Sequence, residues 1–155
     1  DISALSTAVE QVVTNDCDIC IGSRLLSNSK VRNRSLRRSF ISRSYSLIFR
    51  VLFLVSFKDA QCGFKVMLKS SLDEVLPHVK DSGWFFDTEL LILFEKSQYK
   101  ICEIPVIWTD DSNSKVNVIK TAWEDIKGLF RLRFGGLSVC KKVISNRCSR
   151  RIRGI

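Results

Sequence analysis

Apolar and polar residues alternate along this chain with two different periodicities, one typical of helices and the other of strands. Apolar side chains recur every three or four positions in four segments, and each of these is predicted to be a helix: residues 5–13, 35–57, 87–97 and 118–134. Shorter, mainly apolar runs predict three strands: residues 18–21, 63–68 and 101–108. The alternation of helices with strands favours an α/β fold built in layers.

Two helix boundaries carry sequence signals of their own. Ser71-Leu72-Asp73-Glu74 has the form of a capping box and predicts a further short helix that ends by Pro77. Gly135-Gly136 predicts the end of the last helix, and the residues from Leu137 to Ile155 then form a basic amphipathic tail. The core stripe predicted for that last helix is Ile119, Ala122, Trp123, Ile126, Leu129 and Phe130.

The helix predicted at 35–57 is apolar nearly all round in its second half, from Tyr45 to Phe57. That half is too short for a membrane span, and Arg50 interrupts it. Two interpretations remain open, namely a helix buried in the core and a helix that lies in a membrane surface.

The charge of the chain is positive and unevenly distributed. Its 155 residues suit one domain, with a formal net charge of +9. No acid occurs between Asp18 and Asp59 or after Asp125, and both stretches are rich in Lys and Arg. Phosphates, nucleic acid and acidic lipid head groups are all suitable partners for such surfaces. A nucleic-acid-binding module is disfavoured, because the basic segments lack interleaved aromatic residues. A non-catalytic membrane-surface or scaffold module remains the alternative to an enzyme.

The cysteines and the first residue add little chemistry. Cys17 and Cys20 lack a second pair or a histidine at zinc-ligand spacing, so the six cysteines are expected to be free, mostly buried thiols in a reducing compartment. The chain starts at Asp1 without a methionine or a signal-like segment, and we expect it to be a truncated product of a longer protein.

Three segments combine acids, amides and close-approach residues in a way that is typical of a site. Asp59-Ala60-Gln61-Cys62-Gly63-Phe64-Lys65 places a carboxylate and an amide at the entrance of a strand that contains glycine. Asp87 and Glu89 lie within an apolar run. The segment that begins at Glu103 leads through Asp110-Asp111 to Ser114-Lys115.

In this order, and with Gly22-Ser23-Arg24 upstream, the segments resemble glycosyltransferase family 2, above all its polyprenyl-phosphate glycosyltransferases such as the dolichyl-phosphate β-glucosyltransferases. The resemblance implies an α/β fold of GT-A type, a Rossmann-like sheet layered with helices, of which the chain holds only the second half. Residues 1–134 would be the C-terminal part of that domain, and residues 135–155 the basic tail.

The resemblance also implies a reaction. A polyprenyl phosphate, such as dolichyl phosphate, attacks a nucleotide sugar, with UDP-glucose favoured, and the hexose is transferred with inversion. Mg²⁺ or Mn²⁺ would stabilise the leaving diphosphate. Asp1 matches the second acid of the family's metal-binding motif, and the nucleotide-base pocket would lie upstream. We therefore expect this chain alone to be inactive, and the full-length enzyme to be membrane-associated on the cytosolic face, at the endoplasmic reticulum or, in a prokaryote, the plasma membrane.

The resemblance assigns roles to individual residues. Asp59 and Gln61 are the predicted catalytic residues, with Asp59 orienting sugar or acceptor because a phosphate nucleophile needs little general-base help. The predicted phosphate- and acceptor-binding residues are Arg24, Arg34, Arg38, Asp87 and Lys115, since guanidinium groups pair well with phosphate. The Asp110 to Asn117 segment would close over the diphosphate as a loop. Asp110-Asp111-Ser112-Asn113 departs from the family pattern in being more acidic.

Overall fold

A computed structural model describes residues 3–14, 16–110 and 118–153 of the chain, with the side chains of 118–120 and 150–153 left out of the description. The elements run in the following order: α1 (Ser3–Val13), β1 (Ile19–Ser23), β2 (Lys30–Arg32), α2 (Leu36–Phe53), β3 (Lys65–Met67), α3 (Lys69–Val75), the 3₁₀ turn η1 (Leu76–His78), α4 (Phe86–Lys96), β4 (Ile101–Pro105), β5 (Ile107–Thr109), α5 (Val118–Arg131), the π-helical turn η2 (Leu132–Gly136) and α6 (Ser138–Arg153).

The central sheet is small and mixed. Its strand order is β3-β1-β4, with β1 antiparallel to β3 and parallel to β4. All five residues of β1 are buried. Cys20, its second residue, lies opposite Val66 on one side and Cys102 on the other. The mixed α/β class predicted from the sequence is confirmed.

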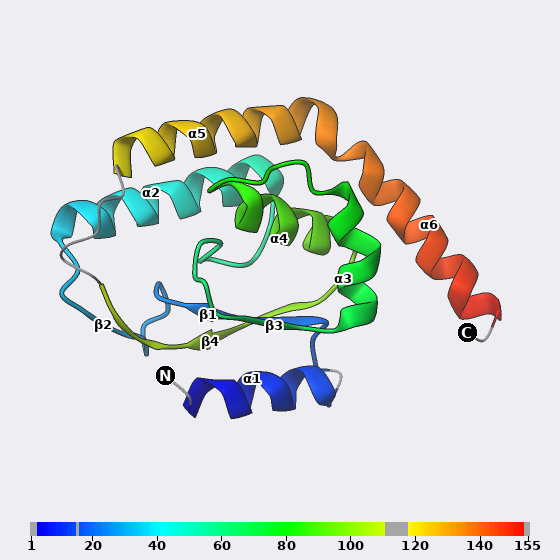
Figure 1. The fold of residues 1–155 in the computed structure, drawn as a ribbon, viewed down its shortest axis with the longest axis horizontal. Helices are drawn as coiled ribbons and strands as arrows, with labels where there is room; N and C mark the ends of the chain where they lie inside the picture. Colours follow the sequence, from blue (N-terminus) through cyan, green and yellow to red (C-terminus); the bar gives the residue numbers. More distant parts are fainter. Residues whose placement is uncertain (1–2, 15, 111–117, 154–155) are drawn as a thin grey trace.

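The helices cover this sheet in layers (Figure 1). Helix α1 packs on one face, with Ala8 and Val12 buried against Cys20 and Ile104. Helices α2 and α4 cover the other face, and α5 lies over α2. The larger hydrophobic core fills the space between the sheet and these helices. Its largest buried side chains include Phe49, Phe57, Phe85 and Phe94.

The strand predicted at 101–108 is wrong as a single element. The structure divides it at Val106 into β4 and β5, and β5 pairs in parallel with β2 in a second, two-stranded sheet. Proline at the end of β4 has no N–H to continue the ladder. The backbone N–H of Lys30 donates to the carbonyl of Val106 instead, so the chain changes partners at that residue. Strand β2, of three residues, was not predicted.

Helix α2 has one buried and one exposed side. Ser35 caps its first turn and accepts a hydrogen bond from the Arg38 backbone N–H at 3.2 Å. The helix ends at Phe53, four residues earlier than predicted, because Leu54 adopts a left-handed conformation with φ 51°. Tyr45 and Phe49 lie in the core, whereas the opposite side is apolar and exposed. The buried side agrees with a core helix, and the contact of the exposed side with a membrane surface stays a prediction.

The capping box predicted at Ser71 is wrong. Helix α3 begins two residues earlier, at Lys69, and no side chain caps it. Ser71 is buried inside the helix, and its hydroxyl donates to Asp18 Oδ1 at 3.3 Å. The serine thus ties the helix to the start of β1 and does not stabilise the helix end.

Helix α5 differs from its prediction in its end and in its buried face. Gly135-Gly136 does not end it, because the π-helical turn η2 leads on into α6. Of the predicted core stripe, Leu129 is buried, but Trp123 and Phe130 are more than half exposed. Gly128 lets the helix approach closely, since a Cβ at this position would lie 2.4 Å from the ring of Phe85.

The predicted tail is helical and partly joined to the core. Cys140 and Val143 of α6 are buried in the main hydrophobic cluster. Arg147 lies over the ring of Tyr99 at 4.2 Å, and its Nη1 donates to the carbonyl of Gln98 at 2.9 Å. The division of the chain at 134/135 stays a prediction.

Two further expectations concern the cysteines and the membrane. The six cysteines are all free thiols, and four of them are buried, as predicted. Within the described residues, we find no helix whose length and apolar character would allow it to cross a bilayer.

Candidate functional site

A cleft of about 480 Å³ opens between α2, α5 and the loops at one edge of the two sheets. Helix α2 and the turn before it supply Arg34, Arg38, Ser42 and Tyr45 to its wall. The remaining polar and aromatic lining comes from four other segments and comprises Gln61, Gly63, Trp84, Asp87, Trp108, Thr109, Asp110, Thr121 and Asp125. Segments that are far apart in the sequence therefore meet around one cavity of the size of a small-molecule site.

Beside this cleft, Arg24 and Asp59 form a two-pronged ion pair. Arg24 Nε donates to Asp59 Oδ2 at 2.8 Å, and Nη2 donates to Oδ1 at 2.9 Å. The backbone N–H of Arg24 donates to the same Oδ2 at 2.8 Å. The guanidinium also lies 5.5 Å from the ring centroid of Trp108. Both side chains are nearly buried, with 13% and 5% of their surface exposed.

Asp59 stabilises the charged form of Arg24. Burial lowers the pKa of Arg24, but the hydrogen bonds and charge of Asp59 outweigh burial and raise that pKa above its ordinary value. On the other side, the backbone N–H of Asp59 donates to Glu103 Oε1 at 3.1 Å. The Asp59 carboxylate is therefore committed to Arg24, and the pair fixes the loop after β1 to the loop before β3.

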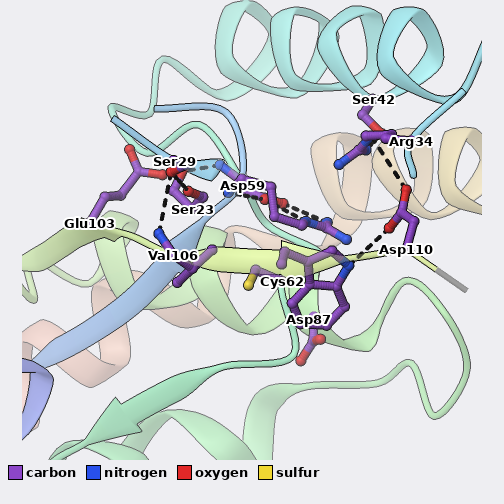
Figure 2. A network of polar contacts seen from close by, with 12 residues as sticks. Ser23, Ser29, Arg34, Ser42, Asp59, Cys62, Asp87, Glu103, Val106 and Asp110 are labelled. Carbon is purple, nitrogen blue, oxygen red and sulfur yellow. Dashed lines mark hydrogen bonds and ion pairs between the residues drawn. The ribbon is translucent and has the colours of Figure 1, made fainter. Parts of the chain in front are cut away.

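The end of β1 is shaped to hold Arg24 in this place. A Cβ on Gly22 would lie 2.7 Å from a methyl carbon of Val106, so only glycine allows β1 to run this close to the end of β4. The hydroxyl of Ser29 donates to the carbonyl of Ser23 and accepts a hydrogen bond from the backbone N–H of Val106 (Figure 2). These contacts close the loop that follows Arg24.

Arg34 and Arg38 meet at the carboxylate of Asp110. Arg34 Nε and Arg38 Nη1 each lie 3.8 Å from Asp110 Oδ2, and Figure 2 shows the contact of Arg34 with Asp110. Trp108 Nε1 donates to Asp110 Oδ1 at 2.8 Å. Arg34 Nη2 donates to the hydroxyl of Ser42, but its buried Nε and Nη1 make no hydrogen bond. Burial and the charge of Arg24 lower the pKa of Arg34. The cleft therefore offers buried guanidinium donors that a bound anion can satisfy.

Lys65 and Asp87 form a third charged contact at the cleft. Lys65 Nζ lies 2.9 Å from Asp87 Oδ2 and also donates to the carbonyl of Cys62. Asp87 is in the first turn of α4 and lines the cleft. The lysine, which belongs to the segment that begins at Asp59, was not among the predicted site residues, although a cation within that segment was a visible signal.

Asp125 is a second residue that sequence reasoning missed. It lies on α5 with 3% of its surface exposed, lines the cleft, and accepts a hydrogen bond from Gln61 Nε2 at 2.5 Å. Burial, reinforced by the negative charges of Asp81 and Glu124, raises its pKa to about 6, against the opposing effect of the Gln61 hydrogen bond. The available signal was an acid one turn before Leu129 on the buried face of a helix.

The structure thus brings Arg34, Arg38, Gln61 and Asp87 together in one cleft, with Arg24 and Asp59 beside it. Asp1 and Lys115 lie outside the described residues. Within the residues that the structure does describe, no three or more His, Cys, Asp or Glu side chains are grouped to hold a metal ion.

Comparison with known proteins identifies relatives that match most of this chain. No family model matches the chain. It is 30% identical over 129 residues to glycosyltransferase AglD of Haloferax volcanii, and 29% identical over 136 residues to a dolichyl-phosphate β-glucosyltransferase of Dictyostelium discoideum. A dolichyl-phosphate β-glucosyltransferase of Saccharomyces cerevisiae is 28% identical over 146 residues. The matches cover 83%, 86% and 88% of this chain.

Over more than four fifths of its length, the chain is similar to named glycosyltransferases, two of which are dolichyl-phosphate β-glucosyltransferases. The resemblance stated from the sequence is therefore confirmed. The chain spans 20%, 42% and 44% of the length of the three relatives, so it corresponds to less than half of each. In this chain, the cleft between α2 and α5 is the candidate site.

Proposed function

We propose that the protein to which this chain belongs transfers a hexose from a nucleotide sugar to a polyprenyl phosphate, with inversion at the anomeric carbon, and that the α2–α5 cleft takes part in this transfer. UDP-glucose and dolichyl phosphate are the proposed substrates, in keeping with the names of two of the relatives. The observation that carries the proposal is that Arg34, Arg38 and Gln61, from separate segments, line one cleft.

The cations of the cleft suit a phosphate on the acceptor side. Two guanidinium groups share one carboxylate, Asp110, at distances longer than a hydrogen bond. Arg34 therefore retains unsatisfied buried donors, and a phosphate has three oxygens to accept from them. Asp110 occupies the place of an anion until the acceptor arrives.

The nucleophile in this reaction is already an anion at neutral pH, because the second pKa of a phosphate monoester is about 6. No side chain has to remove a proton from it. Asp59 is therefore not needed as a base, and its carboxylate accepts three hydrogen bonds from Arg24. We propose that Asp59 acts through Arg24, holding a positive charge beside the cleft, and that Gln61 contacts the sugar.

The metal proposal rests on Asp1 and on residues upstream of it. A bound Mg²⁺ or Mn²⁺ would stabilise the negative charge of the leaving diphosphate. Among the described residues, no three carboxylates are grouped to hold a metal ion, and Asp59 and Asp87 are paired with Arg24 and Lys65. A GT-A domain whose first half precedes this chain remains part of the proposal.

A membrane surface is the proposed location of the acceptor, and α2 offers an exposed stripe to meet it. The residues at intervals of three or four along its outer side are mostly apolar and all exposed: Leu36, Phe40, Arg43, Leu47, Val51 and Leu54. Phe134 after α5 is 81% exposed. In the predicted tail, Val143 is buried. We therefore propose that α2 makes the main lipid contact.

The test is a transfer assay with the complete protein, expressed from its whole gene and supplied with a set of radiolabelled nucleotide sugars. Dolichyl phosphate, undecaprenyl phosphate and the corresponding polyprenols serve as acceptors. Label is expected in the lipid fraction only with a phosphorylated acceptor, most with UDP-glucose, and the product is expected to carry a β-linked sugar by NMR. Transfer to the unphosphorylated polyprenol, or no lipid product from any donor, would overturn the proposal.

A further inference from the structure

Asp125 is a buried carboxylate that is only half satisfied. Its Oδ2 accepts a hydrogen bond from Gln61, whereas its Oδ1 is buried and has no hydrogen-bond partner. None of the roles proposed above uses Asp125. Unlike Asp59 and Asp87, which pair with Arg24 and Lys65, it is not described there as part of an ion pair. The charges that act most on Asp125 are those of two other acids, Asp81 and Glu124, and not those of a cation.

Asp125 lies on a packed helix and not on a loop, so packing fixes its position. It lies in the middle of α5, one turn before Leu129, which is buried in the core. Gly128 sits directly against the ring of Phe85 and leaves no room for the helix to move closer. The carboxylate is therefore held rigidly in the wall of the cleft, as a recognition group must be.

Leaving a buried carboxylate oxygen without a donor costs free energy of folding, because the group has lost its hydrogen bonds to water. A ligand that donates to Oδ1 recovers this cost on binding. Among the groups of the proposed substrates, a phosphate is unsuitable because it carries the same charge as Asp125, and it has the unsatisfied donors of Arg34 in the same cleft. A sugar hydroxyl is neutral and can donate to Asp125 while also contacting the neighbouring Gln61.

We propose that Asp125 Oδ1 accepts a hydrogen bond from one hydroxyl of the transferred hexose, which makes Asp125 a specificity-determining residue for the sugar. This inference rests on the proposed function and deepens it. Arg34 would then bind the phosphate group and Asp125 the sugar hydroxyl, so each residue would contact a different part of the substrates. The Gln61–Asp125 hydrogen bond would hold the amide in place beside the same sugar.

The experiment compares the complete wild-type protein with its Asp125→Asn variant on UDP-glucose and on the UDP-sugars that lack one hydroxyl each. For the wild type, loss of the one hydroxyl that Asp125 contacts is expected to lower kcat/KM by about 10- to 100-fold, as for a hydrogen bond to a charged group. In Asp125→Asn, activity with UDP-glucose falls by a similar factor, and the penalty for that same deoxy sugar shrinks to less than about threefold. The isosteric amide keeps an oxygen for Gln61.

Glu124→Gln is the matched control, since it removes the neighbouring, exposed carboxylate of the same helix. It is expected to leave both the rate and the deoxy-sugar pattern unchanged. The ribose of the donor is a second source of hydroxyl groups, and binding of UDP alone separates the two. Asp125→Asn should bind UDP as the wild type does, whereas weaker UDP binding would place the contact on the ribose and overturn the assignment to the hexose.

Two results count against the inference while leaving the proposed function intact. One is a wild-type enzyme that transfers glucose but discriminates against no monodeoxy donor by more than threefold. The other is an Asp125→Asn variant that loses activity equally with every donor, which indicates a structural role. Absence of any transfer by the wild type, in contrast, contradicts the proposed function itself.

Discussion

Arg24 donates hydrogen bonds to both carboxylate oxygens of Asp59, across 35 residues of sequence. The pair is nearly buried and joins the end of β1 to the segment that precedes β3. Each partner is surrounded by protein and compensates the charge of the other, so removal of one leaves an uncompensated buried charge. The pair is therefore a structural element of the site as well as a candidate for its chemistry.

Asp59→Asn is expected to lower the free energy of unfolding by about 3 kcal/mol, because an amide cannot accept both hydrogen bonds from the guanidinium. Urea unfolding of the complete protein measures this change. Asp73→Asn is the matched control, since Asp73 pairs with Lys69 on the surface of α3 and both side chains are more than half exposed. Its effect should stay below about 1 kcal/mol. Equal effects of the two substitutions would show that the buried pair is not a stabilising anchor.

Asp110→Asn is expected to strengthen the binding of phosphates to the cleft. Asp110 Oδ2 lies 3.8 Å from both Arg34 and Arg38 and competes with an incoming anion, whereas the Asn side chain still accepts the hydrogen bond of Trp108. Calorimetry with inorganic pyrophosphate should show an affinity about two- to fivefold higher than that of the wild type, at low salt. Weaker binding would mean that Asp110 organises the two arginines and does not compete for them.

The raised pKa of Asp125 predicts a pH-dependent effect on stability. The folded state holds this carboxyl with a pKa of about 6, above the ordinary value of 3.8, so folding favours its protonated form. The resulting penalty is full above pH 6 and vanishes below pH 4. Asp125→Asn should therefore stabilise the protein at pH 8 by on the order of 1–3 kcal/mol, and this gain should disappear as the pH falls from 6 to 4.

Chemical unfolding at pH 8, 6 and 4 checks this expectation. A gain in stability that is the same at all three pH values would show that the carboxyl is not penalised for its charge. Together with the expected loss of sugar transfer, a stabilising substitution at Asp125 would indicate that the residue is kept for function at the expense of stability.

The exposed side of α2 is expected to contact lipid. Replacing Leu47 and Val51 with Glu puts two charges into the apolar stripe and should weaken co-sedimentation of the complete protein with anionic vesicles by about tenfold or more. Val13→Glu is the control, because Val13 is 69% exposed on α1, on the other side of the sheet. An equal loss of binding for both variants, or none for either, would contradict a lipid contact through α2.

Periodicity predicted most helices of the fold, because each has a core face that the chain must bury. The small second sheet could not be predicted in this way. Strand β2 has only three residues and is paired only with β5, which the sequence pattern had joined to β4. A partner change at Val106 depends on which backbone groups meet in space. Pro105 indicates where the β4 ladder stops, but not which strand the chain pairs with next.

The candidate site was predictable where one segment carried several polar residues, as from Asp59 to Lys65. The association of Arg34 with Asp110 was not, because these residues are 76 positions apart and meet only through the pairing of β2 with β5. Asp125 was missed because its segment was read for apolar residues alone. The same helical periodicity places Trp123 and Phe130 in the core, although both are exposed in the structure.

We propose that Arg34 binds the acceptor phosphate in the cleft during glycosyl transfer. Steady-state kinetics of Arg34→Ala in the complete protein, with the polyprenyl phosphate and the UDP-glucose concentrations varied in turn, tests it most directly. Arg37→Ala is the matched control, since Arg37 is a neighbouring arginine that is exposed and does not line the cleft. Arg34→Ala is expected to raise the KM for the lipid phosphate by about 10- to 100-fold and to leave the KM for UDP-glucose within about twofold. Arg37→Ala is expected to change neither KM value. An unchanged KM for the lipid phosphate in Arg34→Ala, or an equal rise in both KM values, would contradict the proposal.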